Sequence, residues 1–192
     1  MVIPLERKQL VDTFLHKNSQ LNLSAIRDAE GVYIKHILDS LEVEKFFSSP
    51  EGATVCDVGT GSGFPLLPLA MRFPQSHFTG LDSVRKKLIA IEEMMAVLGI
   101  MNADTVWTRA EDHHKSYDIV MARAVAYIDS LLNWTYHLVK PGGLFVFFKL
   151  YTDEEYQAVL KFIRQKKLTL LKEHRYKLFD GDVERIIYIL KK

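Results

Sequence analysis

A glycine-rich turn directly after a short apolar run constrains the fold of this chain most strongly. Residues 55–65 read VCDVGTGSGFP, in which Asp57 is followed by Gly59, Gly61 and Gly63. Each glycine costs about 0.5–1 kcal/mol inside a regular element, so this cluster indicates a turn that needs φ > 0 or a close ligand contact. Gly63 also allows tight packing where the next helix begins. The pattern predicts a buried strand, a ligand-binding turn and a helix.

From residue 53 onwards, strand-like and helix-like segments alternate. Strands are expected at 54–58, 77–82, 104–110, 117–125 and 143–150, with helices near 65–73, 83–98, 127–139 and 152–167. This alternation predicts a parallel sheet with helices on both faces. Strand patterns at 168–178 and 184–192 flank the turn-forming Phe179-Asp180-Gly181-Asp182 and predict a hairpin. The expected fold is therefore α/β, a doubly wound seven-stranded sheet with one antiparallel strand.

The segment before the first strand has helical periodicity over 4–20 and 29–47. The chain has 192 residues and no sequence feature typical of a linker. We therefore expect a single domain, 1–192, in which an N-terminal helical cap, 1–50, precedes the sheet-forming core, 51–192.

Composition and charge exclude several classes of protein. The 48% hydrophobic content and net charge of +1 are those of a globular chain. Charges within the first residues and the lack of an 18-residue apolar run predict a cytosolic protein without membrane contact. The single cysteine, Cys56, excludes an internal disulfide, and its strand position favours a small buried side chain over a nucleophile. We expect no metal site and a monomer.

Two ligand classes compete for the glycine turn. Dinucleotide binders use G-x-G-x-x-G, but Phe64 stands where the third glycine would be, and Asp57 would repel a pyrophosphate. The spacing D-x-G-x-G-x-G instead suits a ligand with a cationic amino-acid end and no phosphates. Helix capping or turn formation is the alternative role for this acid.

Two further positions complete a candidate ligand site. Asp82 ends the second strand 23 residues after Gly59, where a carboxylate accepts hydrogen bonds from ribose hydroxyls. Ala110-Glu111 ends the third expected strand and is placed to border an adenine ring. S-adenosylmethionine combines these features, whereas capping or turn formation again remains the alternative for Asp82.

Several motifs resemble one family, the bacterial 16S ribosomal RNA guanine-N7 methyltransferases, also called glucose-inhibited division protein B. They are Asn22-Leu23-Ser24-Ala25-Ile26-Arg27-Asp28, His36-Ile37-Leu38-Asp39-Ser40-Leu41, Asp57 to Pro65, Asp82-Ser83 with Lys86-Lys87, and Arg123-Ala124. The second and third are the specific ones, because a generic methyltransferase would share only part of the third. The chain departs from the family pattern at Leu66, Ala122 and Leu150.

The resemblance implies a class I S-adenosylmethionine-dependent methyltransferase fold, which is Rossmann-like, with S-adenosylmethionine as methyl donor. It implies N7 of a guanine in the 530 loop of 16S rRNA as acceptor, in naked rRNA or in a small ribosomal subunit precursor. It places Gly59, Phe64, Ala110, Glu111 and Arg123 in contact with the cofactor.

Arg123 is the candidate catalytic residue. Guanine N7 carries no proton, so methyl transfer needs orientation of the base and no general base. A guanidinium at the end of the fourth strand is suited to bond and stack on a base. The alternative is an ion pair with Asp57 or Glu111 that only shapes the pocket.

Residues 140–192 carry a net charge of +5, whereas 1–139 carry −4. The candidate phosphate contacts are Lys149, Lys161, Arg164, Arg175 and Lys177. A solvated basic face is the alternative. His36 is either an RNA contact or half of a supporting pair with Asp39. Four aromatic residues could stack on bases, although aromatic residues at such positions more often belong to the core: Trp107, Trp134, Tyr127 and Tyr136.

Two other functions fit parts of the pattern. One is methyl transfer to a small molecule or a protein, against which the segment 36–41 argues. The other is a nucleotide- or RNA-binding module without catalysis, which would bind rRNA but transfer no methyl group.

Overall fold

Helices and strands alternate along the chain in the computed structural model, which describes residues 3–46, 48, 50–179 and 181–192. The strands are β1 (Thr54–Val58), β2 (His77–Asp82), β3 (Ala103–Trp107), β4 (Tyr117–Arg123), β5 (Val139–Leu150), β6 (Thr169–Lys177) and β7 (Glu184–Lys191). The α-helices are α1 (Leu5–Leu21), α2 (Ala29–Val32), α3 (Asp39–Leu41), α4 (Leu66–Arg72), α5 (Arg85–Leu98), α6 (Ile128–Thr135) and α7 (Asp153–Lys166). A π-helical segment, η1 (Tyr33–Leu38), joins α2 to α3, and short 3-10 turns are η2 (Glu42–Lys45), η3 (Ala110–Asp112) and η4 (Tyr136–Leu138).

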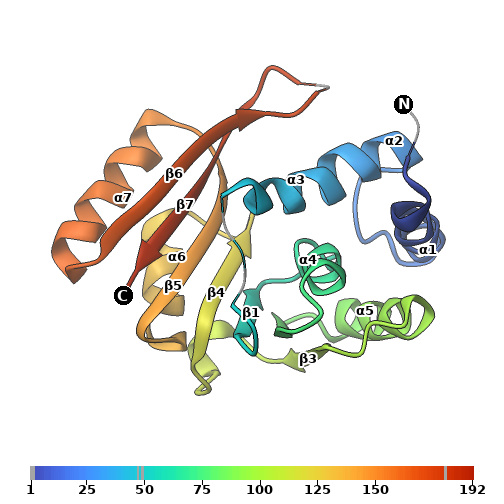
Figure 1. The fold of residues 1–192 in the computed structure, drawn as a ribbon, viewed down its shortest axis with the longest axis horizontal. Helices are drawn as coiled ribbons and strands as arrows, with labels where there is room; N and C mark the ends of the chain where they lie inside the picture. Colours follow the sequence, from blue (N-terminus) through green and yellow to red (C-terminus); the bar gives the residue numbers. More distant parts are fainter. Residues whose placement is uncertain (1–2, 47, 49, 180) are drawn as a thin grey trace.

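The seven strands form one sheet in the order β3-β2-β1-β4-β5-β7-β6 (Figure 1). β1 to β5 are parallel, and β7 lies antiparallel between β5 and β6. This confirms the predicted α/β class and its single reversed strand. The chain changes direction across the sheet between β1 and β4, which places the expected ligand crevice beyond the carboxyl ends of these two strands.

Alternate strand residues point into two separate cores, one on each face of the sheet. One core contains Val55 and packs under α1, η1, α4 and α5, and the other contains Cys56 and packs under α6 and α7. Cys56 is a fully buried free cysteine. In Figure 1 these two helical layers lie on opposite sides of the sheet.

The structure corrects several predicted boundaries. The expected strand 104–110 ends at Trp107, and the expected helix 127–139 ends before the early start of β5 at Val139. The expected helix 29–47 is helical from Ala29 to Lys45, with Phe47 outside the described residues. Asp180 of the expected hairpin turn also lies outside them. None of the helices in the described part of the chain has the length and apolarity needed to span a membrane.

Candidate active site

The glycine turn after β1 has the backbone that its sequence predicts. Gly59, Gly61 and Gly63 all have positive φ, at 66°, 59° and 90°. A Cβ on Gly59 would lie 2.8 Å from the Val125 side chain, and one on Gly63 would lie 2.7 Å from Leu67. Larger residues would therefore strain the turn and displace these neighbours.

Asp57 supplies a buried and unpaired acid beside this turn. The residue is 1% exposed, and neither carboxylate oxygen has a hydrogen-bond partner in the described part of the chain. Burial raises its pKa to about 7, and the nearby Thr60 and Arg123 side chains oppose this shift without cancelling it. An unpaired buried carboxylate is costly, so this position favours a ligand that brings a cationic group.

A pocket of about 280 Å³ opens beside the turn and brings four predicted cofactor residues together: Gly59, Asp82, Ala110 and Glu111. Asp82 Oδ2 accepts the N–H of Gly61 at 3.0 Å, and Oδ1 accepts that of Val84 at 2.8 Å. A carboxylate has about four acceptor sites, so Asp82 shapes the turn and still has capacity for ribose hydroxyls. Together with Asp57, these groups fit S-adenosylmethionine.

Phe64 and His36 form the buried support of the glycine turn. The Phe64 ring is 3% exposed and stacks on the His36 imidazole, with centroids 4.7 Å apart and an interplanar angle of 11°. Burial, and next the charge of Arg123, lower the pKa of His36 to about 3. The structure therefore places His36 beneath the surface, in the supporting position, and Phe64 outside the lining of the pocket.

Arg123, at the end of β4, links the helical cap to the sheet. Its Nη1 donates to Asp39 Oδ2 at 2.8 Å and to the Lys35 carbonyl at 2.9 Å. Its Nη2 lies 3.1 Å from His36 Nδ1, a contact that suits the neutral imidazole as acceptor. The ion-pair partner is thus Asp39, and neither Asp57 nor Glu111.

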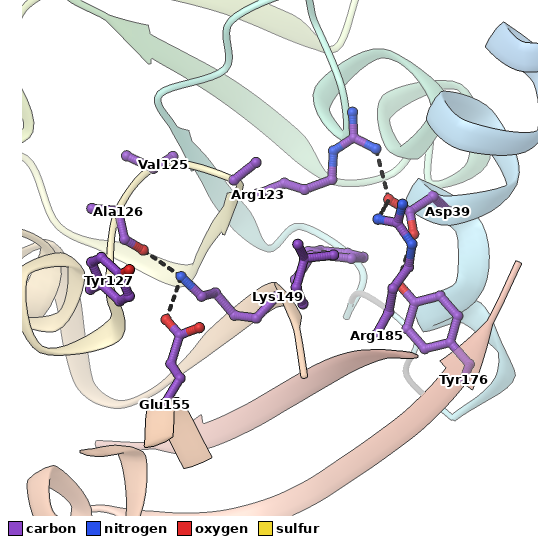
Figure 2. A pocket seen from close by; sticks show the side chains of 12 residues that line it. Asp39, Arg123, Val125, Ala126, Tyr127, Lys149, Glu155, Tyr176 and Arg185 are labelled. Atoms are coloured by element: carbon purple, nitrogen blue, oxygen red, sulfur yellow. Dashed lines mark hydrogen bonds and ion pairs between the residues drawn. The ribbon is translucent and has the colours of Figure 1, made fainter. Parts of the chain in front are cut away.

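Asp39 is fully buried and is shared by three elements (Figure 2). Tyr176 of β6 donates to its Oδ1 at 2.8 Å, and Arg185 of β7 lies 3.4 Å from its Oδ2. Burial and this carboxylate raise the pKa of the Tyr176 hydroxyl. The predicted link between His36 and Asp39 therefore runs through Arg123 and extends to the hairpin.

A second pocket, of about 320 Å³, lies next to the first. Figure 2 shows Arg123, Lys149 and Arg185 around it, with Tyr127 on the opposite side from Arg185. Val125 lines both pockets and contacts the glycine turn. One side chain thus separates a cavity that contains Asp82 and Glu111 from one that contains Arg123, Arg185 and Tyr127.

Lys149 differs from its predicted surface position. Its Nζ lies 2.6 Å from Glu155 Oε1 and also donates to the Ala126 carbonyl, and both charged side chains are 9% exposed. Glu155 Oε1 in turn accepts the N–H of Ile128 at 3.0 Å. Both members of this buried pair hydrogen-bond to the backbone of the loop after β4. Lys149 is therefore not a free cation at the surface.

The other four predicted phosphate contacts are exposed but fall into two groups. Arg175 and Lys177 flank the pocket residue Tyr176 on β6, so their side chains point to the opposite face of the sheet, where the Arg175 guanidinium lies 3.8 Å from the centre of the Tyr151 ring. Lys161 and Arg164 lie on α7, and Arg164 is roughly 14 Å along the helix from the pocket residue Glu155. None of these four residues lines either pocket, and their contact with phosphates stays a prediction, with the β6 pair nearer to the second pocket along the chain.

Sequence reasoning missed several pocket residues. Tyr176 and Arg185 are directly opposite each other in the β6–β7 ladder, so the register of the predicted hairpin could have paired them. Tyr127 and Trp107, left open between the core and a base contact, are 76% and 61% exposed, whereas Trp134 and Tyr136 pack against the core. Among the described residues, no cluster of three or more His, Cys, Asp or Glu is arranged to hold a metal ion.

Comparison with solved structures shows that other proteins share this fold. The chain superimposes on NSun6 from Pyrococcus horikoshii with SFG at a TM-score of 0.67, with 15% identity, over 81% of this chain and 51% of that one. It superimposes on M. jannaschii TYW2 in complex with AdoMet at 0.63, with 16% identity, over 80% and 75%. At these identities the likeness concerns the fold alone.

Comparison with curated sequences is more specific. Ribosomal RNA small subunit methyltransferase G of Lysinibacillus sphaericus (strain C3-41) is 35% identical over 96% of this chain and 81% of its own length. The protein of the same name from Bacillus subtilis (strain 168) is 36% identical over 94% and 79%. The GidB family model, described as rRNA small subunit methyltransferase G, matches residues 6–179. The chain therefore belongs to the GidB family of small-subunit rRNA methyltransferases.

Proposed function

We propose that this protein transfers the methyl group of S-adenosylmethionine to N7 of a guanine in the 530 loop of 16S rRNA. The observation that carries the proposal is the pair of adjoining pockets that meet at Val125. One has the acid and backbone donors that suit the cofactor, and the other has the cationic and aromatic walls that suit a nucleotide.

The cofactor would lie along the glycine turn. Asp57 would face its cationic amino-acid end, Asp82 would accept its ribose hydroxyls, and Ala110-Glu111 would border its adenine. Among these residues, the family resemblance supports Ala110 and Glu111 as cofactor contacts. When bound, the cofactor supplies an electrophilic methyl group on a sulfonium centre.

The acceptor needs positioning more than activation. The lone pair of N7 lies in the plane of the purine and forms the new bond to the methyl carbon, while the electrons of the carbon–sulfur bond remain on sulfur. No proton leaves N7, so none of the pocket residues has to act as a base. Holding N7 in line with this bond is worth up to roughly 7–11 kcal/mol of the barrier.

Arg123 would help to hold the base. Three of its contacts go to Asp39, Lys35 and His36, and a guanidinium has five N–H donors. The remaining donors can reach a guanine carbonyl or a phosphate from the wall of the second pocket. Because Asp39 fixes the side chain, little conformational entropy is lost when such a bond forms.

The test is transfer of labelled methyl from S-adenosylmethionine to 16S rRNA isolated from cells that lack this activity, followed by chemical cleavage at 7-methylguanine. Cleavage at one guanine in the 530 loop is expected. Cleavage elsewhere would refute the site, and label in protein or in small molecules alone would refute rRNA as the acceptor. Binding of rRNA with no transfer would identify a non-catalytic module.

A further inference from the structure

Tyr127 is an aromatic residue whose exposure the fold does not explain. It lies at the mouth of the second pocket, is 76% exposed, and makes no side-chain hydrogen bond or ring contact with the rest of the described chain. Its backbone carbonyl accepts the N–H of Leu131 at 3.0 Å, so the residue is held as the N-cap of α6. The exposed ring is therefore carried on an ordered backbone.

The peptide groups on both sides of Tyr127 are hydrogen-bonded to buried charged side chains. The carbonyl of Ala126 accepts from Lys149, and the N–H of Ile128 donates to Glu155. These two charged residues form the buried ion pair described above. Ala124 has φ 55°, a left-handed conformation that is unfavourable for alanine and persists because the neighbouring contacts determine it. The backbone that carries the ring thus has little freedom to lose on binding.

The position of the ring relates it to both pockets. Val125, two residues earlier, lies between the cofactor pocket and the second pocket. Figure 2 shows Tyr127 on one side of the second pocket and Arg185 on the other, with Lys149 between them. A planar base that enters this pocket would have an aromatic face on one side and fixed cationic donors on the other.

We propose that Tyr127 stacks on the target guanine and holds it during methyl transfer, an inference that rests on the proposed function. Stacking uses the face of the purine, so the in-plane lone pair of N7 stays free to attack. Methylation of N7 moves the positive charge of the sulfonium onto the purine. An aromatic face attracts cations, so the contact strengthens as this charge develops and contributes to kcat as well as to KM.

The test compares Tyr127→Phe, Tyr127→Leu and the matched control Met101→Ala in methyl transfer to the same 16S rRNA. Met101 is also a large exposed residue, at 91%, but it precedes β3 at the amino edge of the sheet. Leucine should lower kcat/KM about 10- to 100-fold, with part of the loss in kcat, whereas phenylalanine should retain most activity. The control should match the wild-type protein.

Two further measurements separate this role from others. Thermal unfolding and the Kd for S-adenosylmethionine should be unchanged in Tyr127→Leu, because the ring contacts neither the core nor the cofactor pocket. Wild-type kcat and KM in Tyr127→Leu would overturn the inference, and so would a loss confined to KM, which would place the ring on RNA outside the pocket. A wild-type protein that transfers no methyl to rRNA would refute the proposed function and this inference with it.

Discussion

Replacing Asp57 with asparagine should change the stability of the protein in a way that depends on pH. The substitution keeps the shape of the side chain but removes its titration. The pKa of Asp57 rises from 3.8 to about 7 because of burial, so the folded state binds this proton more tightly than the unfolded state. The contribution of protonated Asp57 to the free energy of unfolding is therefore complete below pH 3.8. It is lost as pH rises through 7 and the buried carboxyl ionises.

The size of this effect follows from the shift. One pKa unit corresponds to 1.36 kcal/mol, so ionisation of the buried carboxylate costs up to about 4 kcal/mol of unfolding free energy by pH 8. For a chain of this length that corresponds to roughly 10 °C in Tm. Asparagine also leaves a buried amide without partners, at a cost of about 1–3 kcal/mol, but this cost does not vary with pH.

The assay is urea unfolding of Asp57→Asn and of the wild-type protein, without cofactor, at intervals from about pH 4 to about pH 8. The unfolding free energy of the variant minus that of the wild type should rise across this range by the amount above. Asp118→Asn is the control, because hydrogen bonds from Thr54 and the charge of Lys140 lower the pKa of Asp118 to about 2. Its difference from the wild type should stay flat over the same range.

A flat or falling difference for Asp57→Asn would refute the reasoning, because it would mean that the carboxylate is paired in the folded protein. Titration calorimetry with S-adenosylmethionine gives a second check. If Asp57 faces the cationic end of the cofactor, the wild-type protein should bind more weakly below pH 7, and the variant should have weak binding without this pH dependence.

Three further perturbations test other parts of the site. Protonation of His36 should lower the free energy of unfolding by up to about 5 kcal/mol as pH falls from 6.5 through about 3. Urea unfolding of His36→Asn should not show this loss. Asp39→Ala should cost about 3–5 kcal/mol in unfolding free energy, because Arg123 loses its buried partner; a cost under about 1 kcal/mol would contradict the pairing. In filter binding over a salt series, Lys177→Ala should reduce the slope of log affinity against log salt by about 1, and equal effects from Lys161→Ala would contradict the assignment of β6.

The parts of the fold that depend on local sequence were predictable. β1 and β2 have the predicted bounds, because each is a buried apolar strand with an acid at its last or penultimate position before a turn. β5 begins earlier than predicted because Pro141-Gly142-Gly143 reads locally as a loop. The register shift between Tyr117 and Ile119 allows that segment to continue in the strand, where a Cβ on Gly143 would lie 2.7 Å from the Asp118 carbonyl.

The grouping of Gly59, Asp82 and Glu111 in one pocket was also predictable, because they lie at or after the carboxyl ends of consecutive strands, which share one edge of the sheet. The acceptor side was not. Arg123 pairs with Asp39, 84 residues away, and η1 shifts the helical phase of the cap, which periodicity alone does not reveal. The sequence left Tyr127 open between the core and a base contact, because apolar patterning cannot distinguish a ring in the core from a ring at a pocket mouth.

Two buried ion pairs lie at the two ends of the loop after β4. Arg123–Asp39 ties its beginning to the cap and the hairpin, and Lys149–Glu155 ties its end to β5 and α7. Buried ion pairs often contribute no more stability than apolar residues of similar size, since desolvation offsets their attraction. Their directional bonds do, however, fix a backbone in one position. The loop they fix carries Val125 between the two pockets and Tyr127 at the mouth of the second, so these charges are better explained by positioning of the two reactants than by stability of the fold.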